Sequence, residues 1–119
     1  MSTLFQKYGG FGTISKIVMD FYDRLLDSEI AGPFFDDIAM PRLIDHQTKF
    51  IAQVMGGPAA YSNEVLRRVH APYSIDRQAF NEVAGILNAT LQDHGVEAED
   101  IGFIMAEIEA RSPFVISTS

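Results

Sequence analysis

Apolar residues recur with the spacing of an α-helix in four separate stretches of this 119-residue chain. No stretch sustains the alternation of apolar and polar residues that is typical of a β-strand. The positions expected to face inward are Ile14, Ile17, Val18, Phe21 and Leu25; Leu43, Ile44, Phe50, Ile51 and Val54; Phe80, Val83, Ala84, Leu87 and Leu91; and Ile101, Ile104, Met105 and Ile108. The pattern predicts a single all-α domain over residues 1–119.

Residues that begin and end helices bound each of these stretches. Thr13 and Asp76 suit the N-caps of the first and third helices, and Pro41 suits the first position of the second. The expected ends of the second, third and fourth helices are marked by Gly56-Gly57-Pro58, by Gly95 and by Pro113.

Gln47 interrupts the apolar stripe of the second helix. At about 100° per residue it lies near the middle of the inward arc, whereas His46 lies at its edge. A buried amide without a partner costs about 1–3 kcal/mol, so Gln47 needs a backbone carbonyl, a water or a ligand. Tyr22, beside the stripe of the first helix, adds a second polar group to the same interior. Together they suit an apolar pocket with a few placed polar groups.

The remaining two histidines differ in their surroundings. His94 falls in the last turn of the third helix, where the helix dipole favours a cation, so a structural role is expected. His70 lies on the inward face of a short helical piece around residues 63–71, which Pro72 ends. This piece belongs to an irregular connector, 59–75, of a length that is usually functional. From the residues alone His70 is either a core residue or a ligand.

The amino-acid composition limits which metal ligands, nucleophiles and binding partners are possible. The absence of cysteine excludes disulfides, thiolate nucleophiles and cysteine metal sites, so any metal ligand must be a histidine or a carboxylate. A net charge of −7 without a Lys/Arg cluster argues against nucleic acid or an anionic membrane as partner. No apolar run approaches the roughly 18 residues of a membrane helix, and no signal pattern precedes the first helix. We therefore expect a cytoplasmic protein.

The order and spacing of several short motifs resemble those of the group I truncated haemoglobins. These motifs, in register from Phe5 to Phe114, are Gly9-Gly10, "DFYDRLL", "PFFDD", "HQTKF", "GGP" followed by Tyr61, and "VLRRVH". The resemblance implies a globin-like two-over-two helical sandwich with a reduced proximal helix. It also implies haem b as cofactor and the diatomic gases O₂, NO and CO as ligands.

Individual residues match positions with known roles in that family. His70 matches the proximal histidine, which coordinates the iron. Phe35 matches the phenylalanine that packs against the porphyrin face. Tyr22 and Gln47 match the distal pair that hydrogen-bonds iron-bound O₂. The resemblance thus resolves His70 as the expected metal ligand.

Further haem contacts follow from the same resemblance. Leu43 matches the position that closes the pocket beneath the distal pair, and Phe50 is an expected contact on the same stripe. The haem propionates need cationic or hydroxyl partners, for which the candidates are Lys49, Tyr61, Arg67 and Arg68.

The residues do not decide whether His46 occupies the sixth coordination site of the iron. In some cyanobacterial and algal members a histidine at this position binds the iron when no gas is present. Its helical angle puts His46 on the pocket rim, so coordination here would require the helix to shift. The alternative is an exposed histidine or one that contacts a propionate.

Three functions use this one pocket, and the sequence does not separate them. The first is reversible O₂ binding, with conversion of NO to nitrate if a reductase supplies electrons. The second is a non-enzymatic gas-binding or gas-sensing module or an O₂ store. The third is a redox or electron-transfer globin with two histidine ligands, which would follow from coordination by His46.

Overall fold

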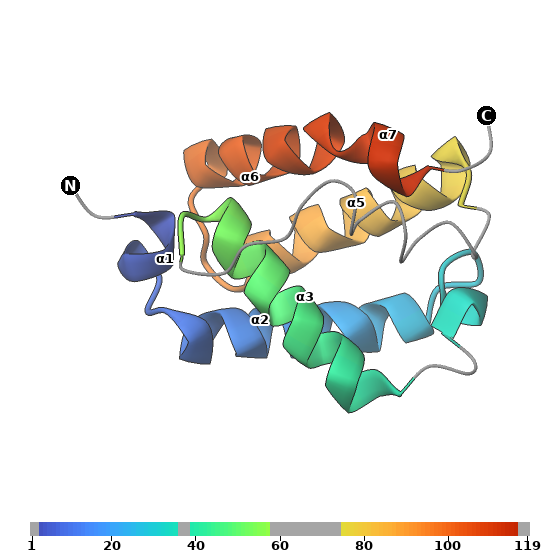
Figure 1. Cartoon of the computed structure of the whole chain (residues 1–119), viewed down its shortest axis with the longest axis horizontal. Coiled ribbons are helices and arrows are strands. Elements are labelled where there is room, and N and C mark those ends of the chain that lie inside the picture. The colour runs from blue at the N-terminus through green and yellow to red at the C-terminus, as the bar shows by residue number, and fades with distance from the viewer. Residues whose placement is uncertain (1–2, 36–38, 58–74, 117–119) are drawn as a thin grey trace.

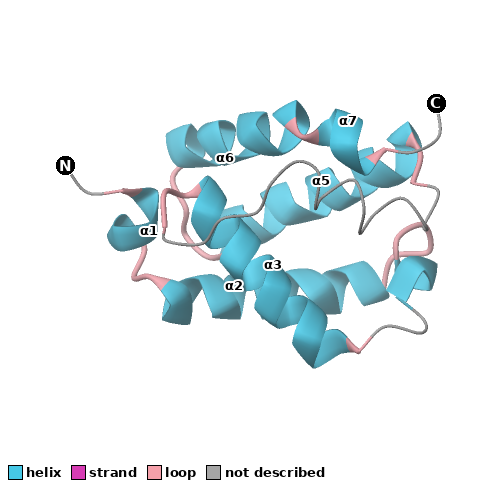
Figure 2. Cartoon of the chain, in the orientation of Figure 1, coloured by secondary structure: helices cyan, strands magenta, loops and turns pink. Residues whose placement is uncertain are grey.

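The computed structural model describes residues 3–35, 39–57 and 75–116, and within these ranges the secondary structure is helical, with no strand (Figure 2). The all-α fold expected from the sequence is therefore confirmed. The helices are α1 (Leu4–Lys7), α2 (Phe11–Leu26), the 3-10 helix η1 (Gly32–Phe35), α3 (Met40–Val54), α5 (Arg77–Asp93), α6 (Ala98–Ala110) and α7 (Ser112–Val115).

Two helix pairs build the domain. Helix α3 crosses α2, and α6 runs beside α5, while α2 also packs against α5 and α3 against α6 (Figure 1). The predicted apolar stripes meet in the space between these pairs. Fully buried side chains come from all four predicted helices and include Ile14, Ile17, Val18, Leu25, Ala52, Leu91 and Ile104. The arrangement agrees with the expected sandwich of two helices over two.

The start of α2 differs from the prediction. Helix α2 begins at Phe11 behind Gly10, so Thr13 is not its N-cap but lies in its first turn. Gly9 and Gly10 both have positive φ angles, of 100° and 74°, and turn the chain sharply into the helix. A Cβ at Gly9 would lie 2.5 Å from Oγ1 of Thr13, so the close approach requires glycine there. The glycine pair, and not the threonine, sets this boundary.

Other boundaries follow the sequence signals more closely. Asp76 caps α5 as predicted, because its carboxylate accepts a hydrogen bond from the backbone N–H of Ala79 at 2.8 Å. Pro41 occupies the second position of α3 and not the first. Helix α6 ends before Pro113 as expected, but the chain then forms α7, which begins at Ser112 and was not predicted.

Three predicted features fall in the part of the chain that the structure does not describe. The short helical piece around residues 63–71, most of the 59–75 connector and the reduced proximal helix lie outside the described residues.

Candidate functional site

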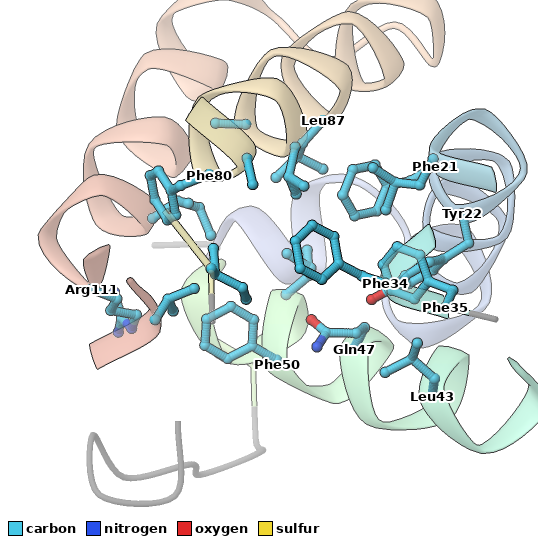
Figure 3. Close-up of a pocket in the computed structure, with 18 residues that line it drawn as sticks. Phe21, Tyr22, Phe34, Phe35, Leu43, Gln47, Phe50, Phe80, Leu87 and Arg111 are labelled. Carbon is cyan, nitrogen blue, oxygen red and sulfur yellow. The ribbon is translucent and has the colours of Figure 1, made fainter. Parts of the chain in front are cut away.

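An apolar cavity of about 300 Å³ lies between the helix pairs, at the end where η1, α5 and α7 meet (Figure 3). Its described lining comes from α2 and η1 on one side, from α3 on a second, and from α5 to α7 on a third. The lining residues are Phe21, Tyr22, Leu25, Phe34, Phe35, Leu43, Gln47, Phe50, Ile51, Ile75, Ala79, Phe80, Val83, Ala84, Leu87, Ile108, Arg111 and Val115. Few of these side chains are polar, so the polar ones determine what the cavity can bind.

Tyr22 is the most deeply buried polar group of the cavity. The residue is only 4% exposed, and its ring meets the edge of the Phe35 ring at a centroid distance of 5.5 Å and an angle of 85°. No described residue hydrogen-bonds its hydroxyl, and burial alone raises the pKa of the phenol above its ordinary value. The phenol therefore stays protonated at neutral pH and can donate a hydrogen bond into the cavity.

Gln47 and Leu43 face the cavity from α3, one helical turn apart. Both residues line the cavity and are half-buried, and in Figure 3 Gln47 lies between Phe50 and the Tyr22–Phe35 pair. Within the described ranges the Gln47 amide has no hydrogen-bond partner either. Two polar side chains from two helices thus meet at one end of the cavity with unused hydrogen-bonding capacity. Both groups can therefore hydrogen-bond to a ligand or a water in the cavity.

The structure brings five of the expected site residues to the cavity wall: Tyr22, Phe35, Leu43, Gln47 and Phe50. It does not bring His46 or Lys49 there. His46 is exposed on α3 and is absent from the cavity lining, whereas its helical angle predicts a place on the pocket rim. Lys49 is exposed and forms a salt bridge of 3.0 Å with Asp45, one turn earlier on α3.

The expected site residues Tyr61, Arg67 and His70, together with Arg68, lie outside the described residues, and their roles stay predictions. Among the described residues no group of three or more histidines and carboxylates is arranged to hold a metal ion. The third histidine, His94, is the C-cap of α5, and its Nε2 lies 2.9 Å from the carboxylate of Asp20 on α2. This hydrogen-bonding position outside the cavity agrees with the structural role expected for His94.

The sequence analysis missed two side chains of the cavity. Phe34 points into it from η1, and Arg111 lies at the end opposite Tyr22 (Figure 3). Arg111 is the only charged side chain among the described lining residues, and it is held over the Phe50 ring at 5.8 Å and by Glu107 at 3.0 Å. The signal for Arg111 was present, because the spacing of Ile104 and Ile108 continues to position 111.

Comparisons with known proteins agree with this geometry. The model of the family described as bacterial-like globin matches residues 3–113. A group 1 truncated haemoglobin of Synechocystis is 32% identical over 114 residues, which cover 92% of this chain and 89% of the relative. One of Mycolicibacterium paratuberculosis is 31% identical over 112 residues, or 94% and 82% of the two chains.

A solved structure extends the likeness to three dimensions. The crystal structure of the truncated haemoglobin from Tetrahymena pyriformis in its Fe(III) form superposes with a TM-score of 0.88 at 26% identity. The match covers 97% of this chain and 98% of that chain. The likeness therefore includes the helices that form the cavity wall. No helix of the described part of the chain is long and apolar enough to cross a membrane.

Proposed function

The chain belongs to the bacterial-like globins, as a group I truncated haemoglobin, and from this premise we propose that it binds O₂ reversibly at a haem b in the cavity described above. Membership of the family implies a haem, whose iron supplies the binding site for a diatomic gas. The observation that carries the proposal is the Tyr22 hydroxyl, which belongs to a residue only 4% exposed, lines the cavity and has no partner among the described residues.

The described residues fit a haem in two respects. The walls are built from phenylalanine, leucine, isoleucine, valine and alanine, which suit the flat apolar face of a porphyrin and exclude water. The Tyr22 and Gln47 side chains supply uncharged polar groups away from Arg111, where a polar ligand would lie. Phe35 and Phe50 are the proposed ring contacts, and Leu43 closes the pocket beside the polar pair.

Tyr22 and Gln47 are the proposed hydrogen-bond donors to the gas. O₂ takes on partial negative charge when it binds, and a donor held at that atom stabilises the bound state. Each charge-assisted hydrogen bond is worth about 1–3 kcal/mol. Two donors could therefore slow the dissociation of O₂ by a few orders of magnitude.

We propose His70 as the protein ligand of the iron. Neither histidine in the described part of the chain lines the cavity, because His46 faces outward and His94 pairs with Asp20. The outward position of His46 also supports a gas-binding site with one histidine ligand over the alternative with two. Lys49, Tyr61 and Arg67 remain the proposed partners of the propionates.

Conversion of NO to nitrate is the reaction that we propose for the oxygenated protein. The reaction joins both atoms of O₂ to NO, which gives nitrate, and takes one electron from the iron. An external reductase has to return that electron before the next cycle. Tyr22 and Gln47 would contribute by retaining O₂ until NO arrives, and the apolar wall by keeping water away from the site.

Optical spectra and rapid mixing test these proposals. A Soret band that forms on haem addition and is lost or shifted in His70→Ala would support haem binding through His70. One broad visible band in the ferrous, gas-free protein would support a single histidine ligand, whereas a split, sharp band would contradict it. Failure of the oxygenated protein to form ferric haem and nitrate rapidly on mixing with NO would rule out the enzymatic reaction.

A further inference from the structure

The turn between α2 and η1 is held by a single side chain, Ser28. Its Oγ accepts hydrogen bonds from the backbone N–H groups of Ile30 at 3.3 Å and Ala31 at 3.1 Å. The same hydroxyl donates to Oε2 of Glu82 on α5 at 2.7 Å. The Ser28 carbonyl accepts from the N–H of Gly32 at 2.9 Å. One serine thus organises the turn and connects it to a helix 54 residues further along the chain.

The end of this turn has little room to take another path. Ala31 is fully buried. A Cβ on Gly32 would lie 2.9 Å from the backbone oxygen of Leu26, so the chain approaches α2 as closely as glycine permits. The direction in which the chain enters η1 is therefore set by this packing together with the hydrogen bonds of Ser28.

The two residues that end η1 form part of the cavity wall. Phe34 and Phe35 both line the cavity, and the Phe35 ring is perpendicular to the Tyr22 ring in an edge contact of 5.5 Å (Figure 3). On the opposite side, Glu82 precedes Val83 on α5 and follows Ala79 by three residues, and both of these line the cavity too. The Ser28–Glu82 bond therefore connects two walls of the cavity from outside it.

We infer that Glu82, through Ser28, is a positioning residue that holds Phe35 in place and thereby orients the Tyr22 hydroxyl toward the gas ligand. The inference rests on the proposed function, because the orientation matters only if Tyr22 donates to a bound gas. Neither Ser28 nor Glu82 lines the cavity, so neither contacts a ligand there directly. The bond is strong for its kind, since a hydroxyl that donates to a carboxylate gains from the charge.

Four variants separate this role from general stability. Glu82→Ala and Ser28→Ala each remove the bond. Glu82→Gln retains an oxygen that can accept from the Ser28 hydroxyl, so it should rescue the Ala phenotype. The matched control is Glu109→Ala, because Glu109 of α6 also contacts another helix, through Arg77 of α5 at 2.9 Å, but is remote from the turn.

The first measurement is amide hydrogen exchange at Ile30 and Ala31 in the haem-free protein. Loss of the bond should accelerate exchange there by about fivefold, the effect of one net hydrogen bond. The second is the C–O stretching band of the carbon monoxide complex, which reports the polar group beside the ligand. The band should broaden or shift in Glu82→Ala and Ser28→Ala, toward its position in Tyr22→Phe, and should remain in place in Glu82→Gln and Glu109→Ala.

The outcomes distinguish the role of Ser28 and Glu82 in the turn from the link between the turn and Tyr22. Unchanged exchange in both alanine variants would overturn the role of Ser28 and Glu82 in the turn. Faster exchange with an unchanged C–O band would overturn the link from the turn to Tyr22. A shift of the C–O band of equal size in Glu109→Ala would also overturn this link, because the shift would then reflect a general loss of stability. Absence of haem binding by the wild-type protein would contradict the proposed function, while the exchange experiment would still test the turn.

Discussion

Replacement of Tyr22 by phenylalanine removes one oxygen atom from the cavity and leaves the ring in place. The ring keeps its edge contact with Phe35 and its packing beside Phe21, at a centroid distance of 5.2 Å. Since the hydroxyl has no partner among the described residues, its loss breaks no hydrogen bond in that part of the haem-free protein. The variant therefore isolates the contribution of the hydroxyl to a bound gas.

Two effects of opposite sign follow from this geometry. Burial of a hydroxyl without a partner costs about 1–3 kcal/mol, and the Tyr22 oxygen faces a cavity rather than packed atoms. We therefore expect the free energy of unfolding of the haem-free variant to rise by about 1 kcal/mol. A charge-assisted hydrogen bond to O₂ is worth about 1.5–3 kcal/mol, so the rate of O₂ dissociation should increase by roughly 10- to 100-fold.

Urea titration of the haem-free protein and stopped-flow displacement of O₂ by CO measure the two effects. Tyr8→Phe is a matched control, because the Tyr8 hydroxyl donates to Asp100 and accepts from the backbone N–H of Glu97, far from the cavity. This control should lower the free energy of unfolding and leave O₂ dissociation unchanged. An unchanged dissociation rate in Tyr22→Phe would refute the donor role. A clear loss of stability in Tyr22→Phe would show that the Tyr22 hydroxyl has a hydrogen-bond partner in the haem-free protein.

Three further predictions concern α3, the turn before η1 and the surface. His46→Ala should leave the visible spectrum of the ferrous, gas-free protein unchanged, because His46 lies on the exposed face of α3; a change would indicate that it binds the iron. Gly32→Ala should lower the free energy of unfolding in urea by about 1–3 kcal/mol, since its Cβ would contact backbone, whereas Gly102→Ala, with open space around it, should not destabilise the protein. The hydrogen bond from His94, followed by those from Arg24, lowers the pKa of Asp20, so this carboxylate stabilises the fold above its ordinary pKa of 3.8 and loses that contribution as the pH falls through its lowered value. Asp20→Asn should therefore reduce the dependence of stability on pH in acid, and an unchanged acid slope would contradict the pairing.

The sequence by itself determined the helices and their inward faces. The stripe predicted for α2 is buried throughout, as are Phe80, Leu87 and Leu91 of the stripe predicted for α5, and Asp76 caps α5 as expected. Gln47 lines the cavity as its position on α3 predicts, whereas His46, which was expected at the rim, is exposed. These features depend on neighbours three or four residues apart, so local spacing is sufficient to predict them.

Other features depend on where the chain returns after a turn. Helix α2 begins at Phe11 and not behind Thr13, because Gly9 and Gly10 have positive φ angles. Close packing of Gly32 against α2 directs η1 toward the cavity. The unexpected α7 lies just beyond Arg111, whose guanidinium forms the charged end of the cavity wall. The hydrophobic periodicity of a single helix does not predict such close contacts between segments.

Contacts between distant segments were decided by the tertiary structure alone. The Ser28–Glu82 bond and the pairing of Asp20 with His94 join residues 54 and 74 positions apart. In sequence, each of these side chains has the appearance of an ordinary solvated surface residue. Helix periodicity specifies which residues face inward, but only the packing angles and turns of the folded chain determine which of them meet, and so which polar groups surround the cavity.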